Sequence, residues 1–458
     1  MIDIKTIHRV YFIGIGGIGM SALARYFKFH GRDVSGYDKT ESALTRLLVA
    51  EGIPVHYEEN LELIPLDTQL VVYTPAVPET HKELIFFREN QYVLLKRSDV
   101  LGAITNSSFN ICVAGTHGKT TITTMIAHLL RHSGYGCNAF LGGISVNYNT
   151  NFWSSDKNVC VVEADEYDRS FLKLSPDIAV ITAMDPDHLD IYGTPQAVQD
   201  AFIEFSARVK PEGLLVSKFG LQQSVRFESP HRMTYGLGQS NADARAEHVR
   251  MDNGSYVFDV IIGKWVLQNV KLNMGGMHNV ENVTAAIAVA QNLGIENERI
   301  REAVETFRGV KRRFEYVIKN QNQVFIDDYG HHPEELRALI SSVKSLFPGK
   351  PCIVIFQPHL YSRTRDFAEG FAESLDLANE VYLLPIYPAR EMPMQGVTSE
   401  IIASKMRVAK VVCCNKEELM VDLELRKEKG DPLGLLVTAG AGDIDRLVEP
   451  IKVILERK

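Results

Sequence analysis

The stretch NICVAGTHGKTT, residues 110–121, decides the fold, because an apolar run leads into a glycine turn and a helical pattern begins directly after it. Glycines let the backbone approach phosphate groups closely, and the N-terminus of a helix favours negative charge. Lys119 can neutralise the charge of the β- and γ-phosphates, and the Thr120 hydroxyl can ligate magnesium. The loop is shorter than the strict G-x-x-x-x-G-K-S/T pattern, because the residue five positions before Gly118 is Val113. Strand, turn, lysine and hydroxyl together predict a triphosphate site in an α/β domain.

The same alternation of short apolar runs with helical patterns extends over the whole chain, and it is typical of parallel sheets wrapped by helices. It falls into three blocks, residues 1–106, 107–310 and 311–458, whose apolar runs include VYFIGI, VCVVEA and PCIVIFQP. Within the second block, residues 232–276 alternate apolar and polar residues around the turn DNG, which predicts a small antiparallel flap. We therefore predict three α/β domains with these bounds.

A second glycine motif, GIGGIGMS at residues 14–21, also lies between an apolar run and a helical pattern. In this context the backbone N–H groups around Gly14, Gly16 and Gly19 can receive a pyrophosphate. Asp38 ends the next apolar run about 20 residues on, where a dinucleotide-binding domain places its ribose-binding carboxylate. The motif alone favours NAD, although a turn that only packs a helix against its strand has the same pattern. We interpret it as a phosphate site and leave the nucleotide open.

Two acidic clusters follow apolar runs of the second block: EADEYD at residues 163–168 and DPDHLD at residues 185–190. Ligands collect at the carboxyl ends of strands in open α/β sheets, and carboxylates suit a hard cation such as Mg²⁺. Most of these acids are interpreted as solvated turn or cap residues. Glu163 is the strongest metal candidate because it ends the run VCVV, where an unpaired carboxylate would be costly. His188 is either an additional ligand or a hydrogen-bonded bystander.

The third block carries three further polar motifs, which are DDYGHHP at residues 327–333, YSRTRD at 361–366 and GAGD at 440–443. Arg363 and Arg365 could clamp a carboxylate or phosphate through paired hydrogen bonds, or form ion pairs on a solvated helix face. The adjacent His331 and His332 are ambiguous in the same way. The Gly-Ala-Gly turn of GAGD follows the run LLVTA and could form another loop that approaches a ligand closely.

The bulk properties argue against several classes of protein. A net charge of −8 disfavours binding to nucleic-acid backbones. No apolar stretch approaches the roughly 20 residues that cross a bilayer, and the N-terminal residues lack the pattern of a signal peptide. We therefore expect a cytoplasmic protein that neither binds nucleic acid nor inserts into a membrane. Four cysteines lie in apolar runs and are expected to be buried rather than joined in disulfides or bound to zinc: Cys112, Cys160, Cys352 and Cys413.

The motifs occur in a characteristic order: GIGGIGMS, GTHGKTT, VVEADE, DPDHLD, GGMHNVENVTAA, RRFE, DDYGHHP, FQPH and GAGD. Over the whole chain this series resembles the Mur ligases of peptidoglycan synthesis. The resemblance implies a Rossmann-like N-terminal domain that holds a UDP-linked substrate and a central P-loop-type ATPase domain. It further implies a Rossmann-like C-terminal domain that binds the amino acid and closes over the site. ATP and Mg²⁺ are the implied cofactors, and the NAD interpretation of the first glycine loop is set aside.

Within this family, the third-block motifs are most similar to those of the members that add L-alanine to UDP-N-acetylmuramate. The nearest alternative is the murein-recycling members, which add an intact L-Ala-γ-D-Glu-diaminopimelate tripeptide to the same nucleotide. Both imply transfer of the ATP γ-phosphoryl group to the lactyl carboxylate, followed by attack of an uncharged amine on the acyl phosphate. An NAD-dependent dehydrogenase and a non-catalytic nucleotide sensor of the same ancestry are the alternatives from other classes. We expect a monomer or a homodimer.

The resemblance also implies roles for individual residues. The UDP-linked substrate would contact Gly14, Ile15, Gly16, Gly17, Ile18, Gly19 and Asp38. ATP would contact Gly115, Thr116, Gly118, Lys119, Thr120, Thr121, His278, Asn279, Asn282, Arg313 and Asp328. The catalytic residues would be Lys119, Glu163 and His188, and magnesium would be bound by Thr120, Glu163 and His188. The amino acid would be held by Tyr329, His331, His359 and Arg363.

The sequence departs from the family pattern at the amino-acid site. Where the family commonly has FQPHR, this chain has Leu360 after FQPH, so Arg363 must carry more of the carboxylate binding. The segment KRSDVLG, residues 96–102, also differs from the usual pattern. The general base for the amine is not assigned by the sequence, and the candidates are His188, His331 and His332.

Overall fold

The computed structural model describes residues 4–186, 189–238, 241–389, 391–431 and 433–457. The chain forms two compact units, which are described separately. The first comprises Met1–Glu247, Asp259–Gln268 and Glu281–Val304, and the second comprises His248–Phe258, Asn269–Val280 and Glu305–Lys458. Three sheets are present, of five, ten and six strands, which confirms the predicted α/β class with three sheet-based blocks.

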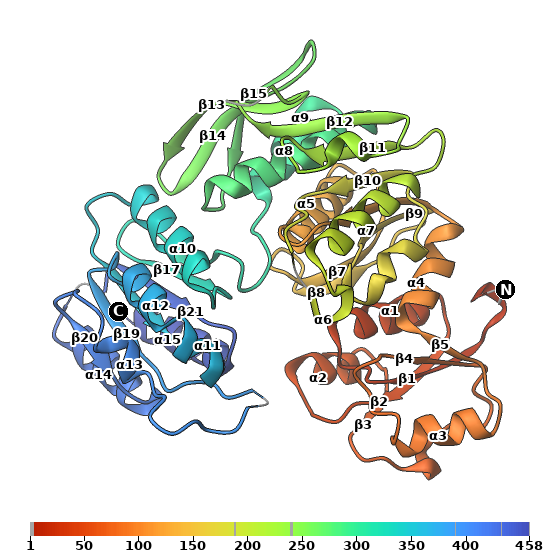
Figure 1. The fold of residues 1–458 in the computed structure, drawn as a ribbon, viewed down its shortest axis with the longest axis horizontal. Helices are drawn as coiled ribbons and strands as arrows, with labels where there is room; N and C mark the ends of the chain where they lie inside the picture. The colour runs from red at the N-terminus through yellow and green to blue at the C-terminus, as the bar shows by residue number, and fades with distance from the viewer. Residues whose placement is uncertain (1–3, 187–188, 239–240, 390, 432, 458) are drawn as a thin grey trace. The chain divides into compact units, whose positions relative to one another are not determined.

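The N-terminal sheet consists of five parallel strands in the order β3-β2-β1-β4-β5 (Figure 1). Its strands are β1 (Arg9–Ile13), β2 (Asp33–Tyr37), β3 (Val55–His56), β4 (Leu70–Tyr73) and β5 (Leu94–Lys96). Its helices are α1 (Ile18–Phe29), α2 (Ala43–Ala50), α3 (Lys82–Glu89) and α4 (Arg97–Asn106). Alternate side chains of β1 point to opposite faces, so Phe12 packs in the cluster of Phe27 whereas Tyr11 packs with Phe87. Helices therefore cover both faces of this sheet.

The central sheet has ten strands in the order β15-β14-β13-β12-β11-β10-β6-β9-β7-β8. The strands are β6 (Phe109–Ala114), β7 (Asn138–Ser145), β8 (Thr150–Trp153), β9 (Val159–Glu163), β10 (Ile178–Ile181), β11 (Leu214–Lys218), β12 (His231–Leu237), β13 (Ala244–Asp252), β14 (Ser255–Ile262) and β15 (Trp265–Leu272). The helices are α5 (Lys119–His132), α6 (Leu189–Tyr192), α7 (Pro195–Ala207), α8 (Met277–Asn292) and α9 (Asn297–Thr306). Strand β6 pairs in parallel with β9 and β10, so the carboxyl ends of all three meet at one edge.

The segment predicted to form a separate flap, residues 232–276, is partly different in the structure. Strand β12 pairs in parallel with β11 and so belongs to the central sheet. The last three strands, β13 to β15, are neighbours joined by two-residue turns, and such turns connect only antiparallel strands. The antiparallel part of the prediction therefore applies to β13–β15, and β12 was wrongly included.

Helix α1 of the N-terminal sheet packs against strands β7 and β8 of the central sheet. The fully buried Asn151 of β8 fixes this contact: its Nδ2 donates to Ile18 O at 2.5 Å and to Ser21 Oγ at 3.0 Å, and its Oδ1 accepts from Arg25 Nη1. Arg25 also forms a bidentate pair with Glu51 at 2.7 and 2.8 Å. The helix that follows the first glycine loop is thereby held in a defined position on the central sheet.

Replacing Asn151 with alanine should lower the free energy of unfolding by about 2 kcal/mol, because it leaves the buried Arg25 guanidinium and the half-buried Ile18 carbonyl without their amide partner. Urea-induced unfolding measures this change. The matched control is Asn158→Ala, since the side chain of the exposed Asn158 donates to Ser107 O at 2.9 Å outside this network. Equal effects of the two substitutions would show that the Asn151 network does not stabilise the docking of α1.

The C-terminal sheet has the order β16-β17-β21-β18-β19-β20, with only β16 antiparallel to its neighbour. The strands are β16 (Glu315–Lys319), β17 (Val324–Asp328), β18 (Cys352–Phe356), β19 (Glu380–Leu383), β20 (Val411–Cys413) and β21 (Leu435–Ala439). The helices are α10 (Pro333–Leu346), α11 (Tyr361–Asp366), α12 (Ala368–Leu375), α13 (Glu400–Ala403), α14 (Lys416–Glu428) and α15 (Val448–Glu456). Cys413 is exposed, contrary to prediction, because β20 is a short edge strand. Among the described residues, no helix has the length and apolar character needed to span a bilayer.

Candidate active site

The GTHGKTT loop connects β6 to the N-terminus of α5, as predicted, and two of its glycines are required by the geometry. Gly115 has φ +139°, and a Cβ at this position would lie 2.0 Å from Thr182 Oγ1. Gly118 has φ +80° and caps α5. Thr182 N donates to Ala114 O at 3.0 Å, and its hydroxyl donates to His117 O. Thr182, the residue after β10, therefore fixes the conformation of the loop through these two hydrogen bonds. The loop leads into the N-terminus of α5, where free backbone N–H groups favour a phosphate.

Lys119 is the first residue of α5, and its side chain contacts one acceptor within the loop and one outside it. Its Nζ donates to Gly115 O at 2.6 Å and to Glu166 Oε1 at 2.8 Å. The side chain of Glu166 is only 1% exposed, so the interpretation of this acid as a solvated turn residue was wrong. The reason lies in the short 3-10 helix η3 (Tyr167–Lys173) that follows β9: Tyr192 Oη donates to Glu166 O at 2.6 Å and holds the turn inward.

Glu163 ends β9 beside the phosphate loop, since it pairs in register with Val113 of β6. A Cβ on Gly142 of β7 would lie 2.1 Å from Glu163 Oε2, so glycine at this position leaves room for the carboxylate. Thr120 lies in the first turn of α5. Over the described residues, no group of three or more His, Cys, Asp or Glu side chains is arranged to hold a metal ion. One carboxylate and one hydroxyl beside a triphosphate loop nevertheless fit Mg²⁺, which commonly completes its shell with substrate phosphates and water.

The other members of the acidic clusters have different partners. Asp165 lies 3.4 Å from Arg97 Nη2, and Asp168 lies 3.8 Å from Lys96 Nζ. Asp185 is mostly exposed, 3.9 Å from His117 Nε2. His188, the predicted second metal ligand, lies outside the described residues. Asp185 N also donates to Thr116 Oγ1 at 3.2 Å, so among the described residues Glu163, Glu166 and Asp185 lie beside the phosphate loop.

The first glycine loop connects β1 to α1, and the Asp38 carboxylate hydrogen-bonds the backbone of this loop. Asp38 Oδ2 accepts from Gly16 N at 2.7 Å, and Oδ1 accepts from Thr40 N at 3.2 Å. A Cβ on Gly16 would lie 2.8 Å from the same Oδ2. Gly14 has φ +85°, and its N–H donates to Tyr37 O at 2.8 Å. Asp38 therefore shapes the loop directly, and its predicted contact with the substrate stays a prediction.

A cavity of about 330 Å³ runs from this loop to Glu163. Its walls include Gly17, Gly19, Thr74, Arg97, Leu101, Phe140, Gly142, Glu163 and Asp165. Arg97 reaches the loop closely, since a Cβ on Gly19 would lie 2.9 Å from Arg97 Nη1. A cationic side chain thus lines the cavity together with the first glycine loop and the candidate metal ligand, which suits a substrate that carries phosphates at one end and a carboxylate at the other.

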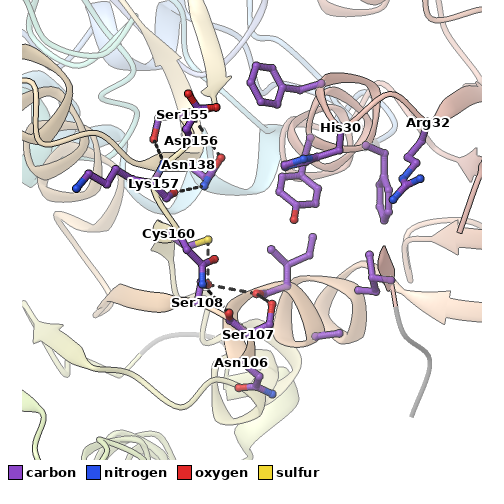
Figure 2. Close-up of a pocket in the computed structure, with 17 residues that line it drawn as sticks. His30, Arg32, Asn106, Ser107, Ser108, Asn138, Ser155, Asp156, Lys157 and Cys160 are labelled. Atoms are coloured by element: carbon purple, nitrogen blue, oxygen red, sulfur yellow. Dashed lines mark hydrogen bonds between the residues drawn. The ribbon is translucent and has the colours of Figure 1, made fainter. Parts of the chain in front are cut away.

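A larger cavity, of about 850 Å³, lies at the opposite edge of the central sheet, beside the first residues of β6, β7 and β9 (Figure 2). Its polar walls are occupied by internal hydrogen bonds. Asn138 Nδ2 donates to Lys157 O at 3.1 Å and to Val159 O at 3.3 Å, and Ser108 Oγ donates to Cys160 Sγ at 3.2 Å. Ligands of open α/β sheets bind at the carboxyl ends of the strands, so the smaller cavity is the candidate active site.

The predicted nucleotide residues of α8 are divided between the two units. Asn282 belongs to the first, and a Cβ on Gly118 would lie 3.3 Å from Asn282 Oδ1, so this amide lies beside the phosphate loop. His278 and Asn279 belong to the second unit. Asn279 is buried, and its Nδ2 donates to Gly275 O at 2.6 Å.

The second unit gathers the RRFE and DDYGHHP motifs. Asp328 ends β17, and its carboxylate accepts from Phe314 N and Gly330 N, both at 2.7 Å. Burial raises the pKa of Asp328. The Arg313 guanidinium lies 5.7 Å from the centre of the Tyr329 ring. Arg313 and Asp328, the predicted ATP residues of the RRFE and DDYGHHP motifs, thus lie close together: Asp328 bonds the residue after Arg313, and Arg313 contacts the residue after Asp328.

The four predicted amino-acid residues also cluster in this unit. The ring centres of Tyr329 and His331 are 5.2 Å apart, and those of His331 and His359 are 5.9 Å apart. Arg363 follows on α11, and burial together with its positive charge lowers the pKa of both histidines. Within the described part of the chain, the buried Arg363 Nη1 has no hydrogen-bond partner. An unsatisfied buried guanidinium nitrogen fits the binding of a carboxylate.

Leu360 and His332, two residues that the sequence singled out, lie at the starts of helices in this unit. Leu360, which stands in place of the family arginine, has φ +70° and precedes α11, with its N–H donated to Tyr387 O at 2.9 Å. His332 begins α10, where its N–H donates to Glu335 Oε2 at 3.0 Å. His331 N donates to the same Glu335 oxygen at 2.9 Å, so these backbone bonds do not distinguish the two histidines as general-base candidates.

Asp327, the neighbour of Asp328, predicts a pH dependence of stability. Burial raises its pKa from 3.8 to about 7, against opposing contributions from the Thr438 hydroxyl bond and the Arg312 guanidinium 3.7 Å away. Between about pH 4 and pH 7 the unfolded chain releases this proton before the folded chain does, so the free energy of unfolding should fall as the pH rises. Urea unfolding of Asp327→Asn should show a shallower decline across this window, and an unchanged decline would contradict the assignment.

Comparison with known proteins assigns the whole chain to one family. The Mur ligase family catalytic domain matches residues 9–109, the Mur ligase middle domain matches 113–290, and the Mur ligase glutamate ligase domain matches 312–442. The chain is 47% identical to a UDP-N-acetylmuramate–L-alanine ligase of Cytophaga hutchinsonii, covering 100% of this chain and 98% of the relative. It is 48% identical to the same enzyme of Phocaeicola vulgatus, with both chains covered completely. This chain belongs to the Mur ligase family.

Solved structures of Mur ligases share the fold. The UDP-N-acetylmuramate-alanine ligase of Thermotoga maritima is 29% identical to this Mur ligase, with 98% of this chain and 99% of that chain covered and a TM-score of 0.81. A murein peptide ligase of Psychrobacter arcticus is 20% identical, covers 98% of this chain and 99% of its own, and reaches a TM-score of 0.65. The second comparison concerns the fold alone.

Two residues of this Mur ligase were missed as site residues by the sequence reasoning. Glu166 was counted among solvated acids, and Arg97 was noted only as part of an unusual segment. Each is identified by a partner that is distant in sequence, Lys119 for Glu166 and Asp165 for Arg97. The signal available in advance was the position of EADEYD at the carboxyl end of a strand, next to the phosphate loop.

Proposed function

We propose that this Mur ligase joins L-alanine to the lactyl carboxylate of UDP-N-acetylmuramate, at the expense of ATP, in the synthesis of peptidoglycan precursors. The observation that supports this site is the cavity of about 330 Å³, whose walls include residues of the first glycine loop and Glu163. The choice of substrates is supported by the full-length identity of 47–48% to relatives named for this reaction. We further propose that the enzyme acts in the cytoplasm, as a monomer or a homodimer.

In this proposal each block of the chain binds one substrate. Residues 1–106 bind the UDP-linked sugar through Gly14–Gly19 and Asp38, with Arg97 facing its phosphates or carboxylate. Residues 107–310 bind ATP through Gly115–Thr121 and Asn282. Residues 311–458 bind the amino acid through Tyr329, His331, His359 and Arg363, and contribute Arg313 and Asp328 to the nucleotide.

The reaction follows from these roles. A carboxylate oxygen of the sugar nucleotide attacks the γ-phosphorus of ATP and releases ADP, which gives an acyl phosphate. The uncharged amine of alanine then attacks the carbonyl carbon, and phosphate leaves. Lys119 stabilises the negative charge of the transferring group, and His331 is a candidate to accept the amine proton. Magnesium, held by Thr120, Glu163 and His188, would supply further charge stabilisation.

Phosphate release from ATP and magnesium in the presence of UDP-N-acetylmuramate tests the proposal, with L-alanine and the L-Ala-γ-D-Glu-diaminopimelate tripeptide supplied in parallel. Release with alanine alone is expected. Release with the tripeptide alone would keep the mechanism but assign the chain to murein recycling. Release with neither would contradict the proposed substrates.

A further inference from the structure

The ion pair between Lys119 and Glu166 determines where the lysine ammonium group lies at the phosphate loop. Lysine has three N–H donors. Two of them are used in this structure, by Gly115 O at 2.6 Å and by Glu166 Oε1 at 2.8 Å. Gly115 lies in the loop and Glu166 lies in the turn after β9, so together the two acceptors fix the position of the ammonium group and the direction of its third donor.

The burial of this pair indicates that it persists when ATP binds. The side chain of Glu166 is 1% exposed and that of Lys119 is 14% exposed. Removing the cation from a buried carboxylate is strongly unfavourable. A lysine that left Glu166 to reach the phosphates would incur this cost at each turnover, whereas a lysine that stays can offer its third N–H to the phosphate.

Glu166 is itself held in place by the chain around it. Its carbonyl accepts from Tyr192 Oη at 2.6 Å and from Arg169 N at 3.0 Å. The Arg169 guanidinium lies 5.2 Å from the centre of the Tyr192 ring. The turn after β9 and helix α6 therefore fix the backbone from which Glu166 reaches Lys119.

We infer that Glu166 is a positioning residue for the ligase reaction, which acts through Lys119 by holding its ammonium group at the triphosphate loop. Its relation to Lys119 parallels the lysine–glutamate pair of protein kinases, in which the lysine contacts phosphates while it is paired. The inference rests on the proposed function, since it concerns the ATP site of that reaction. Glu166 is not among the proposed metal ligands, so this role is separate from magnesium binding.

The first test compares Glu166→Gln with wild type. The amide keeps nearly the same shape but removes the charge that orients Lys119, so kcat/KM for ATP should fall about tenfold or more, with little change in KM for UDP-N-acetylmuramate and L-alanine. Glu166→Asp, which restores the carboxylate, should recover part of the loss. The matched control is Glu204→Gln, because Glu204 forms an exposed ion pair with Arg208 at 2.9 Å. Thermal unfolding of each variant separates a folding defect from a site defect.

A double-mutant cycle decides whether Glu166 acts through Lys119. Binding of ATP with magnesium is measured for wild type, Glu166→Gln, Lys119→Met and the double variant. Glu166→Gln should weaken binding in the wild-type background and change it less than about twofold when Lys119 is already absent. An equal loss in both backgrounds would overturn the inference, and so would tighter binding by Glu166→Gln, which would show that the carboxylate competes with phosphate for the lysine. Failure of the wild-type chain to bind ATP would instead contradict the proposed function.

Discussion

Lys119→Met should abolish ligation and reduce kcat/KM for ATP by a factor of about 10³ or more. The substitution removes the ammonium group that donates to Gly115 O and Glu166 Oε1 at the phosphate loop. Coupled detection of ADP release in the presence of all three substrates measures the effect. The matched control is Lys210→Met, which removes an ion pair with Asp177 at 2.7 Å at the opposite edge of the sheet.

The same substitution removes the cation that faces the buried Glu166 carboxylate, so its unfolding midpoint should also fall. The variant that combines Lys119→Met with Glu166→Gln should recover stability without recovering activity. A Lys119→Met enzyme that retains activity within about tenfold of wild type would contradict the assignment of this loop to the triphosphate.

Glu163→Gln should lower kcat by about 10³-fold and raise the magnesium concentration needed for half-maximal rate, because the amide is a poorer ligand for a hard cation than the carboxylate. Glutamine has nearly the same size as glutamate, so it fits the space that Gly142 leaves around residue 163. Initial rates measured over a range of magnesium concentrations test this expectation, with Glu204→Gln as the isosteric control. A variant with the wild-type magnesium dependence would show that Glu163 is not a metal ligand.

The fold was largely predictable because its signals are local. The phosphate loop, Lys119 and Gly118 are recognised from a strand, a turn and a helix that follow one another directly in the sequence. Strand β12 was misassigned because its first residues are exposed and alternate in polarity, although it pairs with the buried β11. Cys413 was misassigned because an apolar run does not reveal that its strand lies at the edge of the sheet.

The site was less predictable because its side chains come from distant parts of the chain. Glu166 pairs with a residue 47 positions away, and Arg97 with one 68 positions away. Asp38 illustrates the opposite case, since its place in the sequence was recognised but its carboxylate hydrogen-bonds the loop itself. Sequence patterns therefore predicted the segments of the candidate site, and the tertiary structure showed which of their side chains contact one another.

The transfer of oxygen from substrate to phosphate tests the central claim most directly. UDP-N-acetylmuramate labelled with ¹⁸O in both carboxylate oxygens is incubated with the enzyme, ATP, magnesium and L-alanine, and the released phosphate is analysed by mass spectrometry. An acyl phosphate requires that each phosphate carry a single ¹⁸O atom and that the amide product retain the other. Unlabelled phosphate, formed at the same rate as the amide, would contradict activation of the carboxylate by ATP.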